Sequence, residues 1–151
     1  MIRITRPISV LSFIGLFLFV SNENFSQAAE ISLSDQEAKR TAEFMLKTIE
    51  QAKTEFGKIL DTGDDSTYLR KVKAPLQNEI RGWPEQNRAI FPYSECRLAA
   101  QDLLQITEEL RHPMINSEGT WLKHLKQNFH TDLPGCRKSI KHPDMSLKNI
   151  Q

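Results

Sequence analysis

Along the segment from Asp35 to Asp61, apolar residues recur at alternating steps of four and three, and no other feature limits the possible folds as much. An α-helix places residues at that spacing on one face, so the segment predicts a single amphipathic helix. At about 1.5 Å per residue this helix would be roughly 40 Å long. Ser34 and Glu37 form an S-x-x-E capping box at its start, and Gly63 suits its end. The apolar positions are Ala38, Ala42, Met45, Ile49, Ala52, Phe56 and Ile59.

Two further segments show the same spacing. Residues 65–82 predict a second helix, and Pro75 within it predicts a kink or a break, because proline lacks the N–H that an interior helical residue donates. Residues 94–111 predict a third helix, which ends before Pro113 because proline disfavours a helical conformation in the residue before it. The expected core positions are Leu69, Val72, Leu76, Ile80 and Trp83 in the second helix, and Cys96, Ala99, Leu103, Ile106 and Leu110 in the third.

A fourth helix is predicted after a short loop, with Asn116 or Ser117 as its cap. The stretch DLPGCRKSIKHPDM predicts one further short helical turn, which places Cys136 and Ile140 on one side. No segment alternates apolar and polar residues with a period of two, so no strand is predicted. The sequence therefore predicts an all-α fold, a four-helix antiparallel bundle with a short C-terminal helical turn. The residues of the fourth helix expected to face inward are Trp121, Leu122, Leu125 and Phe129.

The first residues of the chain have the order of a secretory signal peptide: a basic region, an apolar region and a region with small residues. Arg3 and Arg6 precede residues 8–20, which are almost wholly apolar. Ser26 and Ala28 then offer the small side chains that a signal peptidase reads. A transmembrane anchor is the alternative, but a span needs about 20 apolar residues, and this run is shorter. We therefore expect export to the periplasm or full secretion, with no stable membrane anchor after cleavage.

Cleavage is expected after Ala28, with Ala29 as the alternative. Residues 1–28 are then the signal peptide, and residues 29–151 form a single helical domain of ordinary size, with residues 142–151 as a loose tail.

The mature chain is expected to be close to electrically neutral. The whole chain has 20 basic and 19 acidic side chains, and the predicted signal peptide removes two arginines and one glutamate. Proteins that bind nucleic acid usually show a basic surface, so this composition does not favour a nucleic-acid partner. It gives no charge-based reason for membrane-surface binding either.

The chain has two cysteines, Cys96 and Cys136. A short loop joins the third and fourth predicted helices, so these two helices should be antiparallel, with the end of the fourth beside the start of the third. In an oxidising compartment, two cysteines brought together in this way predict one disulfide. Closing a loop of about 40 residues should stabilise the fold by roughly 4 kcal/mol. Two free thiols are the alternative if the chain is not exported.

The sequence contains no motif for haem attachment, metal binding, nucleophilic catalysis or phosphate binding. Neither cysteine belongs to the C-x-x-C-H motif of covalent haem attachment, and the histidines form no H-E-x-x-H metal motif. A non-covalent haem held by Met45 and His124 is conceivable, although the spacing of Met45 is that of a core residue. There is no G-x-S-x-G nucleophile motif and no glycine-rich phosphate loop. The sequence therefore predicts no catalytic residue, no metal site and no cofactor.

The connection between the second and third helices is unusually apolar for a loop. It contains Trp83, Arg88, Ile90, Phe91 and Tyr93, and aromatic and arginine side chains often dominate the energy of protein interfaces. One interpretation is that the connection lies across the end of the bundle with Ile90 and Phe91 buried. The other is that these five residues form an exposed partner-binding patch, because contiguous exposed apolar surface tends to mark contact sites.

These features together predict a small exported bacterial helical protein that acts by binding another protein and is not an enzyme. An inhibitor, an immunity-type protein or an adaptor is expected, with an exported or envelope protein as its partner. The alternative is a periplasmic helical bundle that binds a small ligand, a haem or a metal.

Overall fold

The computed structural model describes residues 33–112 and 119–149, all of which belong to one compact unit. The predicted signal peptide, its cleavage site and the predicted cap of the fourth helix lie outside these residues. No helix in the described ranges is both long and apolar enough to cross a membrane.

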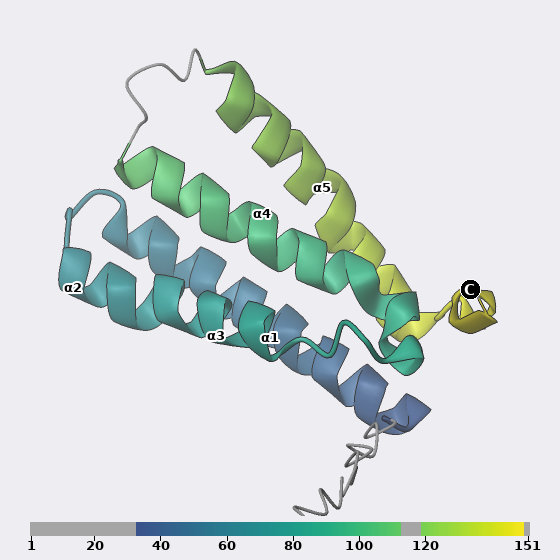
Figure 1. The fold of residues 1–151 in the computed structure, drawn as a ribbon. Helices are drawn as coiled ribbons and strands as arrows, with labels where there is room; N and C mark the ends of the chain where they lie inside the picture. The colour runs from purple at the N-terminus through teal and green to yellow at the C-terminus, as the bar shows by residue number, and fades with distance from the viewer. Residues whose placement is uncertain (1–32, 113–118, 150–151) are drawn as a thin grey trace, which may run out of the picture. The chain divides into compact units, whose positions relative to one another are not determined.

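Within the described residues the chain is helical and contains no strand, so the predicted all-α class is confirmed (Figure 1). The second helix is continuous but changes its winding twice, so it takes three labels. The elements are α1 (Asp35–Ile59), α2 (Asp65–Tyr68), the π-helical turn η1 (Leu69–Lys73), α3 (Ala74–Gly82), the 3-10 helix η2 (Arg88–Tyr93), α4 (Ser94–Arg111), α5 (Thr120–Lys141) and the 3-10 helix η3 (Met145–Asn149).

Helix α1 begins and ends as its sequence predicts. The Ser34 hydroxyl accepts a hydrogen bond from the Glu37 N–H at 3.2 Å, and the Glu37 carboxylate accepts one from the Ser34 N–H at 2.8 Å. At the other end Gly63 has a φ of +65°, a left-handed conformation that favours glycine, and its N–H bonds to the Ile59 carbonyl at 3.1 Å. All seven predicted apolar positions of this helix are buried.

The second helix continues through Pro75 instead of breaking there. The π-helical turn η1 lies just before this proline, and the Ala74 N–H bonds to the carbonyl of Leu69, five residues back. This wider turn makes room where the proline ring would otherwise meet the preceding turn of an α-helix. On this helix Tyr68 is buried and Leu69 is exposed. The prediction of Leu69 as a core residue is therefore wrong.

Helix α5 also contains a proline, Pro134, and runs through it without a break. Pro134 is exposed, so water can reach the carbonyl that it leaves without a helical partner. Cys136 and Ile140 are both buried, as predicted, but they lie in α5 and not in a separate turn. The short C-terminal turn is η3, within the stretch predicted as a loose tail. It contacts η2 and forms an ion pair between Lys148 and Asp35.

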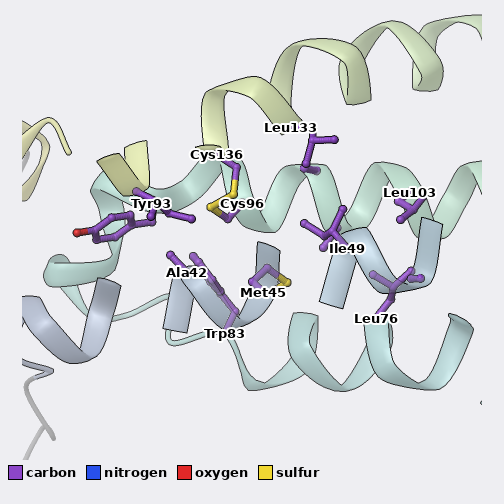
Figure 2. Packing of buried hydrophobic residues seen from close by; sticks show 14 of the residues in the cluster. Ala42, Met45, Ile49, Leu76, Trp83, Tyr93, Cys96, Leu103, Leu133 and Cys136 are labelled. Atoms are coloured by element: carbon purple, nitrogen blue, oxygen red, sulfur yellow. A yellow bond between two sulfur atoms is a disulfide. The ribbon is translucent and has the colours of Figure 1, made fainter. Parts of the chain in front are cut away.

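The core gathers side chains from every main helix. Helix α4 packs most extensively against α5, while α1 contacts α3, α4 and α5. Figure 2 shows the Cys96–Cys136 disulfide among the same buried side chains as Met45 and Ile49 of α1. The predicted disulfide is therefore confirmed, and both cysteines are fully buried.

Candidate functional site

The five residues predicted to bind a partner do not form one exposed patch. Trp83, Ile90 and Tyr93 are buried in the core, and Ile90 is only 1% exposed. Phe91 is partly buried, and Arg88 is exposed. The Asn87 side chain accepts a hydrogen bond from the Ala89 N–H at 3.0 Å and so starts the 3-10 helix η2, which contacts α1, α4 and α5. These positions agree with the interpretation in which the connection lies against the bundle.

The strongest candidate for a binding site is a groove of about 690 Å³ beside the last turns of α4. It lies between the α2–η1 segment and the start of α5, and we call it the α4 groove. Its apolar part is formed by Tyr68, Leu69 and Trp121, and its polar part includes Lys73, Gln105 and Glu108.

Tyr68 forms a firm floor for the α4 groove. Its hydroxyl is hydrogen bonded to the Thr107 hydroxyl at 3.2 Å, and Thr107 donates in turn to the Leu104 carbonyl at 2.8 Å. Burial raises the pKa of Tyr68, so the phenol stays protonated and can donate in this chain. The Phe56 ring packs edge-on, with the two ring centres 6.1 Å apart. The floor is thus held from both α1 and α4.

Arg111 ties the turn after α1 to the end of α4. Its guanidinium lies 4.9 Å from the centre of the Tyr68 ring, a cation–π arrangement. The same group donates to the Gly63 carbonyl at 3.2 Å and forms an ion pair with Asp65. The Arg111 side chain is only 8% exposed, so it stabilises the packing of these elements and is not available to a ligand.

The rim of the groove is apolar and open. Leu69 is 52% exposed and Trp121 is 48% exposed, although both were predicted to face the core. Between Thr120 and Asp132, Leu125 is the one side chain that is buried. The prediction for Trp121 is wrong because spacing identifies a helix face but does not show how far neighbouring helices extend to cover it. The rim charges are paired, with Lys73 and Glu108 forming an ion pair at 2.8 Å.

A pair of carboxyl groups lies on the seam between α4 and α5. Asp102 of α4 faces Asp132 of α5, and its Oδ2 atom is buried without a hydrogen-bond partner among the described residues. Burial raises the pKa of Asp102 to about 6, and the adjacent Asp132 carboxyl adds to the increase through its charge and through a hydrogen bond. The sequence offered no sign of this pair, because the two residues meet only when the helices pack.

Replacing Asp102 with asparagine is expected to stabilise the protein at neutral pH by about 1 kcal/mol. Because the pKa of Asp102 is higher in the folded than in the unfolded chain, the folded state binds more protons between about pH 4 and about pH 6. The free energy of unfolding of the wild-type protein should therefore fall as pH rises through this window, and Asp102→Asn should flatten that decrease. Urea unfolding across the window measures both effects. Asp61→Asn, at an exposed turn, is the control, and an equal gain in that variant would contradict the prediction.

The described residues contain no group of three or more His, Cys, Asp or Glu side chains placed to hold a metal ion. Of the two conceivable haem ligands, Met45 is fully buried in the core, whereas His124 is exposed on α5. No protein-family model, curated protein or solved structure matches the chain.

Proposed function

We propose that the chain is an exported helical protein that acts by binding another exported or envelope protein, as an inhibitor, an immunity-type protein or an adaptor would. The observation that carries this proposal is the exposure of Leu69 and Trp121 on the rim of the same groove. Large apolar side chains that gather at one hollow are typical of contact surfaces, and tryptophan is enriched among the residues that dominate interface energy. Burying the exposed half of each side chain would contribute roughly 1 kcal/mol.

The rigid floor of the α4 groove supports the same proposal. Tyr68 is held by Phe56, Thr107 and Arg111, so a partner side chain would meet a surface that is already formed. A preformed site loses little conformational entropy on binding, which favours affinity. The disulfide is compatible with an oxidising compartment, where such bonds persist.

The test is a photoreactive amino acid placed at Leu69 in the full chain, expressed in its own host. We expect a discrete cross-linked species of defined mass, because a partner in the groove would lie against this side chain. Leu98 of α4 is the matched control, since it is similarly exposed, at 46%, and does not line the groove. The same species at both positions, or none at Leu69, would overturn the proposal.

Trp121→Ala, introduced beside the photoreactive residue at Leu69, is expected to weaken the cross-link about tenfold, equivalent to about 1.4 kcal/mol of binding. Because Trp121 is half exposed, the free energy of unfolding should change by no more than about 0.5 kcal/mol. Quantified cross-linking and urea unfolding measure the two effects. An undiminished cross-link would show that Trp121 does not contact the partner.

A small-ligand carrier is the second candidate, and the size of the groove favours it. Pockets for small molecules have volumes of about 300–1,000 Å³, a range that includes the α4 groove. Native mass spectrometry of protein purified from its host separates the two functions. A stoichiometric bound small molecule that Trp121→Ala removes supports the carrier.

A further inference from the structure

The charges of this nearly neutral chain are not evenly distributed. Helix α5 has five lysine and arginine residues and a single acidic residue, Asp132. Its basic residues are Lys123, Lys126, Arg137, Lys138 and Lys141. The net charge of the whole chain does not show this excess of basic residues in α5, because the rest of the chain has a slight excess of acidic residues.

The basic residues of α5 lie on one face of the helix. At 3.6 residues per turn, Lys123, Lys126, Arg137 and Lys141 fall within a stripe about 120° wide and about 27 Å long. His130 lies in the same stripe, and Lys138 lies at its edge. We call these six residues the basic stripe. All of them are exposed, and the stripe lies beside the buried face of the helix, which α4 and α1 cover.

Most of the basic stripe has no acidic partner. Arg137 forms an ion pair with Glu50 of α1 at 3.0 Å, while Lys123, Lys126 and Lys141 form none with the described residues. The single acid of the helix, Asp132, faces Asp102 of α4. Lys138 and Lys141 lie in the last turn of α5, where a positive charge interacts favourably with the helix dipole. Lys123 and Lys126 lie in the first half of the helix and are like charges three residues apart, an arrangement that destabilises a helix slightly. For these two lysines the fold therefore gives no electrostatic reason.

Acidic side chains flank the basic stripe. Glu50 of α1 lies beside Arg137, and the Glu95 side chain of α4 lies against Gly135, where an added Cβ would be 3.0 Å from it. A broad anionic surface, such as a bilayer, would press against these acids as well as the lysines. The apolar face of α5 is already used by the core, so the helix cannot insert into a membrane as an amphipathic helix does. A narrow occupant can instead contact Lys123, Lys126 and Lys141, which form no ion pair with the described residues.

We propose that the basic stripe of α5 binds an acidic segment of the partner protein, an extended or helical stretch rich in aspartate and glutamate. This inference rests on the proposed function, because it names the chemistry of the partner protein proposed above. The surface it assigns to that partner is a different one from the α4 groove. Complementary charge of this kind steers association and selects among partners more than it adds affinity. Binding should therefore weaken steeply as salt is added.

The probe is a fluorescent peptide of about eight glutamates, which spans roughly 27 Å when extended. Protein purified after expression of the full chain is titrated into it at low salt, and fluorescence anisotropy reports the dissociation constant. The triple variant Lys123→Glu, Lys126→Glu and Lys141→Glu is expected to bind at least about tenfold more weakly. The control is Lys39→Glu, Lys47→Glu and Lys53→Glu on the exposed face of α1, which changes the net charge equally and should bind within about threefold of the wild-type protein.

Three outcomes would overturn the inference. One is that the wild-type protein leaves the peptide unbound. Another is that the two triple variants lose affinity equally, which would show an effect of net charge alone. A third is tighter binding to vesicles of phosphatidylglycerol than to the peptide, with the same dependence on the stripe, which would assign the surface to lipid. If the peptide does not bind but the cross-link at Leu69 still forms, the inference about the basic stripe is wrong and the proposed function stands. If the peptide binds but the cross-link does not form, the proposal for the α4 groove is wrong.

Discussion

Removing the Cys96–Cys136 disulfide is expected to lower the free energy of unfolding by about 4 kcal/mol. The bond joins residues 40 apart in sequence, so its loss frees a long loop in the unfolded chain. It also links the first turn of α4 to the last turns of α5, the part of α5 that is anchored in the core. Because domains of this size are stable by only about 5–15 kcal/mol, the loss would be a large share of the total.

Urea unfolding of the wild-type protein, with and without a thiol reductant, measures this effect. The double variant Cys96→Ala and Cys136→Ala should resemble the reduced wild-type protein and should not respond to the reductant. Both cysteines are fully buried, so alanine leaves small cavities and the variant should be slightly the less stable of the two. A reductant effect below about 1 kcal/mol would contradict the prediction.

Ile90→Ala is expected to cost about 3 kcal/mol of folding free energy. Ile90 lies in the connection between α3 and α4, where loop substitutions are usually mild, but it is 1% exposed and belongs to the main buried cluster. Truncation therefore removes buried methyl groups and leaves a cavity. An isoleucine on an exposed binding patch would show no such cost.

Arg88→Ala is the matched control, two residues away in the same 3-10 helix and exposed. It should change the free energy of unfolding by no more than about 0.5 kcal/mol. Thermal or urea unfolding of the two variants compares the buried and exposed positions of one short element. Equal stability in both variants would contradict the burial of Ile90 and restore it as a candidate contact residue.

Most of the helical framework could be predicted because its signals are local. The capping box of Ser34 and Glu37, the left-handed Gly63 and the apolar spacing of α1 each depend on residues within a few positions of one another. The disulfide was also predictable, since a short connection between two helices restricts which ends can meet. Local pattern and chain connectivity were sufficient for these features.

The errors occurred where the outcome depended on neighbouring elements. The chain does not break at Pro75, because a π-helical turn precedes the proline, and Leu69, which was predicted to face the core, is exposed while its neighbour Tyr68 is buried. Trp121 has the spacing of a core residue, yet it lies at the rim of a groove. Neither the groove nor the pair of Asp102 and Asp132 had a sequence signal, because each is assembled from helices far apart along the chain.

The amino-acid sequence by itself determined that the chain is helical, where α1 and α4 begin and end, and that its two cysteines can meet. Periodicity is enough for this, because it assigns each side chain to a face of its own helix. Only the tertiary structure decided which faces are covered, since that depends on the length and position of the helices alongside. In the folded protein the candidate contact residue Ile90 is therefore buried, whereas Leu69 and Trp121 are exposed at one groove. The basic residues of α5 lie together on an exposed surface.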